Sequence, residues 1–197
     1  MNKDLIDTAV GKQPCDLNLS GCTVVDVLGG TFLRDATVSV RSGRVVGVND
    51  GLEARETIDL GGRYLAPGLV DAHVHIESSL LTPAEYARVV LPHGTTTVVA
   101  DPHEIVNVLG YDGMRFMLSA SEGLPLDIFY MVPSCVPATE FDTSGAALYA
   151  SDMYPFLQDE RVLGLGEVMN YPGVLAREQR QKDKIAQFQS ARKPVDG

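Results

Sequence analysis

The chain has 197 residues, of which 45% are hydrophobic and 21% charged, a balance typical of a globular protein rather than a disordered one. Its 16 basic and 26 acidic residues give a net charge of −10, which argues against nucleic acid or an anionic membrane as partner, because both need clustered Lys and Arg. The three cysteines form no Cys-x-x-Cys pair, and no apolar run resembles a signal peptide or is long enough to span a membrane, so we expect a reduced, cytoplasmic protein.

The first third of the sequence is rich in β-forming residues. Residues 1–16 are polar and fit either a short helix or a loose arm. From Asp16 to about Leu60, apolar runs of about five residues alternate with turn residues such as Gly29-Gly30 and Ser42-Gly43. This spacing predicts a small antiparallel sheet.

After Pro67 the sequence changes to alternating strands and helices. We expect strands at 69–73, 95–100, 126–132 and 162–167, and helices at 82–91, 106–121, 145–157 and 177–192. The strand ends lie about 30 residues apart, which is the size of a strand–helix–strand unit. Four such units predict a parallel sheet, either doubly wound or part of an eight-unit barrel. A whole barrel takes about 250 residues, so this chain would supply roughly half of one.

The first of these strands carries a His-x-His pair. In an extended strand, residues two apart project to the same side, so His73 and His75 should share a face with Asp71 and Glu77. Neutral imidazole nitrogens bind divalent metals. Such a pair could equally be two exposed or core histidines, but its place at the C-terminal end of a barrel-type strand favours a metal site.

The second and fourth strands also end in candidate functional residues. Glu167 closes the fourth strand, where a carboxylate is costly to bury unless it is paired or bound to a cation; it could bridge two metals or simply be solvated. Asp101-Pro102-His103-Glu104 closes the second strand, and His103 could contact substrate or an extra metal, or cap the next helix. His93 precedes the second strand and so belongs at the opposite, structural face.

Longer runs in the chain, from about residue 20 to its end, resemble the bacterial adenine deaminase family of the amidohydrolase superfamily. The matching runs are 66–83, 91–97, 100–105, 131–138 and 166–173. The resemblance implies that residues 66–197 form the first half of a (β/α)8 barrel, strands 1–4, and that residues 1–65 form an N-terminal arm and part of a small β-sandwich domain.

The resemblance also implies a reaction, the hydrolysis of adenine to hypoxanthine and ammonia by a metal-bound hydroxide. It implies a two-metal centre, with manganese as the first choice and iron as the alternative. His73 and His75 carry over as metal ligands, and Glu167 as a bridging ligand and catalytic group. The residues expected near the substrate are Glu77, Ser78, Asp101, His103 and Glu104.

Two other interpretations remain open. The chain could be another amidohydrolase, such as a dihydropyrimidinase or an amino-sugar deacetylase, although the Glu-Ser-Ser and Asp-Pro-His-Glu runs favour the deaminase. It could also be a non-catalytic remnant that pairs with a separate half, because family members continue through strands five to eight and this sequence stops at Gly197. We therefore expect self-association or a complementary C-terminal half as partner, besides a small-molecule substrate.

Overall fold

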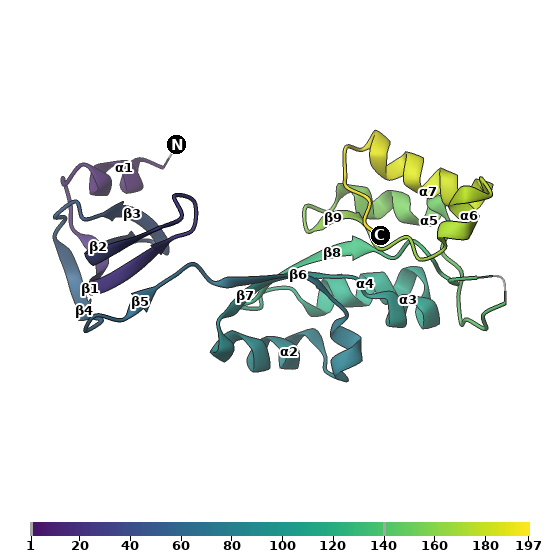
Figure 1. Cartoon of the computed structure of the whole chain (residues 1–197), viewed down its shortest axis with the longest axis horizontal. Helices are drawn as coiled ribbons and strands as arrows, with labels where there is room; N and C mark the ends of the chain where they lie inside the picture. The colour runs from purple at the N-terminus through teal and green to yellow at the C-terminus, as the bar shows by residue number, and fades with distance from the viewer. Residues whose placement is uncertain (1, 140) are drawn as a thin grey trace. The chain divides into compact units, whose positions relative to one another are not determined.

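The computed structural model describes residues 2–139 and 141–197. Two compact units are present, Met1–Pro67 and Gly68–Gly197, and each is built around its own β-sheet (Figure 1). No helix within the described residues is both long and apolar enough to cross a membrane.

The first unit consists of one helix and a five-stranded sheet. The helix, α1 (Lys3–Ala9), begins at Asn2, whose side chain accepts a hydrogen bond from the amide of Asp4 at 3.1 Å. The strands are β1 (Cys15–Asp26), β2 (Thr31–Arg41), β3 (Arg44–Val48), β4 (Ala54–Asp59) and β5 (Tyr64–Leu65).

The sheet of this unit is mixed, whereas the sequence predicted an antiparallel one. Strands β1, β2 and β3 are antiparallel, as short hairpin connections require. After β3 the chain crosses to the free side of β1, where β4 and then β5 pair with it in parallel. Because β1 is 12 residues long, its single edge accommodates both of these strands.

The second unit is built on four parallel strands. These are β6 (Leu69–Val74), β7 (Thr95–Ala100), β8 (Asp127–Val132) and β9 (Val162–Leu165). They lie in the sheet in the order in which they occur in the sequence, without the reversal that defines a doubly wound fold. The predicted barrel-type strand–helix repeat is thereby confirmed, and the doubly wound alternative is excluded (Figure 1).

The helices between and after these strands agree only partly with the predicted ones. They are α2 (Pro83–Val90), α3 (His103–Leu109), α4 (Tyr111–Ala120), α5 (Ala150–Met153), α6 (Tyr171–Leu175) and α7 (Gln179–Ser190), with 3-10 turns η1 (Ile76–Ser79), η2 (Leu91–His93) and η3 (Tyr154–Gln158). The helix predicted at 82–91 is present as α2, with Thr82 as its N-cap and Pro83 in its first turn.

Two predicted helices differ in detail, and one helix was not predicted. The single helix expected at 106–121 is two helices, because Gly110 adopts a φ of +59° that a regular helix does not allow. Of the helix predicted at 145–157, only α5 and η3 are present. Its first residues are not helical because the backbone of Gly145 packs directly on Val108, so closely that a Cβ on Gly145 would lie 2.4 Å from the Val108 carbonyl oxygen. The short helix α6 was not anticipated; Asn170 caps it by accepting a hydrogen bond from the amide of Gly173 at 3.0 Å.

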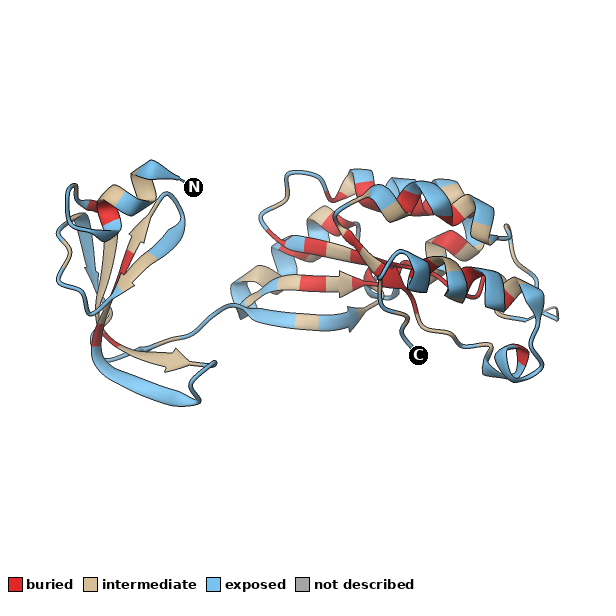
Figure 2. Cartoon of the chain, turned by 90° about the horizontal axis from the view of Figure 1, so that it is seen from above, coloured by how far each residue is buried: buried red, intermediate tan, exposed pale blue. Residues whose placement is uncertain are grey.

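The core of the second unit lies between the sheet and its helices, where Figure 2 shows most of the buried residues. By contrast, the first strand of this sheet is exposed, with Leu69 and Val70 each more than 60% accessible. At the other edge the chain returns beside β9, where Val195 pairs in parallel with Leu165 and the amide of Asp196 donates to the Leu165 carbonyl at 3.0 Å. Residues 194–196 therefore extend the sheet in the parallel sense.

Candidate metal centre

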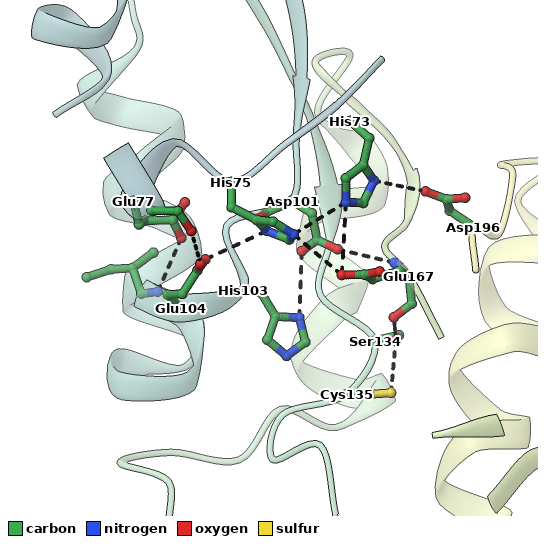
Figure 3. Close-up of polar contacts among 12 residues, drawn as sticks. His73, His75, Glu77, Asp101, His103, Glu104, Ser134, Cys135, Glu167 and Asp196 are labelled. Atoms are coloured by element: carbon green, nitrogen blue, oxygen red, sulfur yellow. Dashed lines mark hydrogen bonds and ion pairs between the residues drawn. The ribbon is translucent and has the colours of Figure 1, made fainter. Parts of the chain in front are cut away.

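Two strands of the second unit bring together three potential metal ligands. His73 and His75 stand at the C-terminal end of β6, and Glu167 follows the end of β9. Although β6 and β9 are separated by two strands, one ligand atom from each residue lies within 4.8 Å of the others. Curvature of the sheet explains this approach, because a barrel-forming sheet bends its outer strands toward each other. Figure 3 shows the three side chains converging.

Hydrogen bonds on the outer side of each ring fix which nitrogen faces the other ligands. The Nδ1 of His73 lies 3.3 Å from a carboxylate oxygen of Asp196, and the Nδ1 of His75 lies 2.7 Å from the Asp101 carbonyl oxygen. A carboxylate and a carbonyl oxygen can only accept a hydrogen bond, so each Nδ1 must carry the proton and donate it in the bond. In the neutral rings the proton-free nitrogen is therefore Nε2, the orientation expected of metal-binding histidines.

Three hydrogen-bond acceptor atoms face one another at the middle of the centre. The two Nε2 atoms lie 3.3 Å apart, and a carboxylate oxygen of Glu167 lies 3.4 Å from that of His75 and 3.9 Å from that of His73. With both rings neutral, no proton stands between these three acceptors. Two imidazole nitrogens and a carboxylate are the donor set that zinc, manganese and iron accept. The residues present thus fit a divalent cation.

The charge around His75 supports the same conclusion. Its pKa is raised, although burial alone acts to lower it, because the Asp101 carbonyl and the carboxylates of Glu104, Asp101 and Glu167 outweigh that effect. The site therefore favours positive charge, which a proton or a metal ion can supply.

Asp101 and His103 lie beneath the candidate ligands. The side chain of Asp101 is only 1% exposed, and burial raises its pKa to about 7, against the opposing effects of His75 and of the hydrogen bond from the Glu167 amide. His103, through its Nδ1, faces a carboxylate oxygen of Asp101 at 3.8 Å, and burial lowers the pKa of this histidine. These two side chains are close enough to interact through a small shift or a bridging water.

The remaining residues expected near substrate form a second group beside His75. Ser78 donates to a carboxylate oxygen of Glu104 at 2.5 Å, and the other oxygen of Glu104 lies 3.7 Å from the Nδ1 of His75. Glu77 instead accepts from the amide of Ile105 at 3.2 Å, at the start of α3. The carboxylate of Glu77 is therefore engaged with the backbone of α3, and Glu104 is the more exposed of the two glutamates.

An open pocket adjoins His103 and Glu104. Its other lining residues are Asn107, Ala138, Asp142, Thr143 and Met169, none of which the sequence analysis singled out. His93 lies elsewhere: it ends η2 just before β7, and the carbonyl of Gly94 accepts from the amide of Leu69 at the start of β6. It therefore stands at the opposite end of the strands from His73 and His75, as expected.

The sequence of this chain matches a known protein family and curated relatives. Residues 64–191 match the model of the amidohydrolase family. An adenine deaminase from Desulfatibacillum aliphaticivorans is 49% identical to this chain, in an alignment that covers all of this chain and 34% of that protein. The chain spans about a third of the length of the curated relatives it matches.

Two solved structures share the fold at low sequence identity. A zinc complex of atrazine chlorohydrolase from Arthrobacter aurescens TC1 is 17% identical with a TM-score of 0.56, over 82% of this chain and 51% of that one. An L-hydantoinase from Arthrobacter aurescens is 21% identical with a TM-score of 0.53, over 78% of this chain and 33% of that one.

Proposed function

The chain belongs to the amidohydrolase family, and on that basis we propose that the protein hydrolyses adenine to hypoxanthine and ammonia. The observation that carries the proposal is the convergence of His73, His75 and Glu167 in a chain 49% identical to an adenine deaminase. Adenine is thus the proposed small-molecule partner. Likeness to a hydantoinase extends only to the fold, so it does not favour a cyclic amide as substrate.

We propose that His73, His75 and Glu167 hold divalent metal in a two-metal centre, with manganese as the first choice and iron as the second. Glu167 would bridge the two ions, which also makes it a catalytic group. When bound, the metal supplies Lewis acidity that activates water at neutral pH. The histidines offer Nε2 because Asp196 and the Asp101 carbonyl hold each Nδ1–H.

Other residues beside the centre would contact the substrate or hold a proton. Asp101 is buried and has a pKa of about 7, so it can hold or release a proton beside Glu167 at neutral pH. His103 and Glu104 line the adjoining pocket and are proposed to contact the purine, with Ser78 holding Glu104 in place. Glu77 remains a weaker candidate because its carboxylate already caps Ile105.

We also propose how this chain relates to the whole enzyme. Residues 1–65 would form part of a β-sandwich, and 66–197 the first four strands of a barrel whose other strands contribute further ligands. Deamination would then require that second half, either from the same protein or from a separate chain. The three free cysteines support a reducing, cytoplasmic setting.

The test combines metal binding with turnover. Manganese titrated into the purified chain should bind, and His73→Ala or Glu167→Ala should abolish binding, whereas His93→Ala, a histidine at the opposite end of the strands, should not. Adenine turnover should be absent with the 197-residue chain and should appear when the rest of the barrel is supplied. Turnover approaching that of a whole relative from the chain alone, or binding indifferent to His73→Ala, would contradict the proposal.

A further inference from the structure

The main chain of Glu167 is fixed by side chains from two other strands. Its amide donates to a carboxylate oxygen of Asp101, just after β7, at 3.2 Å. Its carbonyl accepts from the hydroxyl of Ser134, just after β8, at 2.5 Å. The metal-facing carboxylate therefore projects from a peptide segment that is hydrogen-bonded on both sides, and Figure 3 shows the bond between the Glu167 amide and Asp101.

Ser134 is itself held in place from a helix. This residue is fully buried, and its carbonyl accepts a hydrogen bond from the Nζ of Lys184, on α7, at 2.5 Å. The Ser134 hydroxyl also lies 3.1 Å from the sulfur of Cys135. Since a hydroxyl has one proton, the much shorter contact assigns that proton to the Glu167 carbonyl.

Lys184 is an unusual residue to find at this position. Its side chain is fully buried, and within the described residues no carboxylate lies within ion-pair distance of it. Burial, followed by the neighbouring charge of Arg180, lowers its pKa to about 8, so it remains mostly protonated at neutral pH. An apolar side chain of similar length would avoid the cost of burying an ammonium group. What Lys184 provides that an apolar residue could not is the hydrogen bond to Ser134.

We propose that Lys184 and Ser134 are positioning residues for the metal centre. Lys184, on α7, donates a hydrogen bond to the Ser134 carbonyl, and the Ser134 hydroxyl donates one to the Glu167 carbonyl. This inference rests on the proposed role of Glu167 as a metal ligand. Neither residue touches the metal or the substrate. Their effect is to restrict where the Glu167 backbone, and hence its carboxylate, can lie.

The size of the expected effect follows from how strictly metals constrain their ligands. Ligand distances must be right to within about 0.2 Å, so a small displacement of the Glu167 backbone weakens coordination. Loss of a hydrogen bond that orients a ligand costs about 10- to 100-fold in metal affinity. Because Lys184 acts through Ser134, its removal should cost about as much as removal of the serine hydroxyl, and the two losses should not add.

The first measurement is manganese affinity of the purified chain, read from the electron paramagnetic resonance signal of free Mn²⁺. We expect Ser134→Ala and Lys184→Met each to weaken binding about tenfold, and the double variant to weaken it no further. The matched control is Ser190→Ala, on the same helix, where the hydroxyl donates to the Ala186 carbonyl at 2.7 Å on the exposed side. Lys184→Met should leave the unfolding midpoint unchanged or raised, which separates positioning from general stability.

The second measurement needs no metal. Amide hydrogen exchange at Met169, whose amide donates to the Glu167 carbonyl at 3.0 Å, should accelerate in Ser134→Ala and Lys184→Met, and stay unchanged in Ser190→Ala. Unchanged exchange in either variant overturns the inference, as does unchanged manganese affinity in a chain that binds the ion. If the chain binds no manganese while exchange responds as expected, the positioning link holds and the proposed metal centre fails.

Discussion

The hydrogen bond between Asp196 and His73 makes a direct prediction about metal binding. Asp196→Ala removes the carboxylate that accepts from the Nδ1 of His73 at 3.3 Å. Without that acceptor, the proton is free to move to Nε2, the nitrogen that faces His75 and Glu167. A protonated Nε2 cannot bind a metal, so the fraction of binding-competent chain should fall.

The magnitude should lie near the low end of the range for such contacts. Carboxylates that orient a metal-binding histidine contribute about 10- to 100-fold in affinity. The side chain of Asp196 is 49% exposed, and water screens an interaction at that exposure. We therefore expect a loss of about tenfold, or about 1.4 kcal/mol. Asp196→Asn keeps a neutral acceptor and should lose less.

Two assays check this prediction. Nitrogen-15 spectra of labelled histidine should show His73 as the Nδ1-protonated tautomer in the metal-free native chain, and as a mixture of the Nδ1 and Nε2 tautomers in Asp196→Ala. Manganese titration should then show the tenfold loss, while Asp183→Ala, an exposed carboxylate on α7, should have no effect. A His73 that keeps its Nδ1 proton in Asp196→Ala, together with unchanged affinity, would refute the assignment of Asp196 as its partner.

Three further predictions concern stability and assembly. The pKa of Lys184 is about 8 in the folded chain and 10.5 when unperturbed, so between these pH values the unfolded state binds a proton that the folded state has lost. The free energy of unfolding should therefore rise by up to about 3 kcal/mol as the pH increases from about 8 to 10.5. Urea melts of Lys184→Met should lack that rise. Tyr130→Phe leaves the Met117 carbonyl without the 2.9 Å hydrogen bond from the buried phenol, and should cost about 1–3 kcal/mol in the same melts. The exposed edge strand with Leu69 and Val70 should make the chain self-associate at micromolar concentration, and Val70→Lys should reduce this in sedimentation experiments; a native chain that stays monomeric would show that four units close their own core.

The strands of the second unit were predictable because their signal is local. Runs such as Thr95–Ala100 are β-branched and apolar over their whole length, and they recur at the spacing of a strand–helix unit. The rule that parallel strands end at one edge then brought His73, His75 and Glu167 together without any structure. Where helices failed, long-range packing overrode local preference: the segment from Gly145 to Leu148 has helix-forming alanines, but its backbone is bonded to α3 instead, through the amide of Gly145 and the Asn107 carbonyl at 3.0 Å.

Asp196 and Lys184 were missed for a different physical reason, because nothing local in a sequence marks the distant partner of a polar side chain. Asp196 lies in a Pro-Val-Asp-Gly segment that is typical of a turn, and nothing in it indicates pairing beside β9.

Lys184 lies in a helix crowded with charged and amide side chains, where any one lysine resembles the rest. One signal was present nonetheless. Ile185 and Phe188 mark the apolar stripe of this helix, and Gln181 and Lys184 fall on the same stripe at helical spacing. The large majority of buried polar groups find a hydrogen-bond partner that the rest of the fold supplies. A lysine inside an apolar stripe therefore points to a specific acceptor, and in this fold the acceptor is the carbonyl of Ser134, one hydrogen bond away from Glu167.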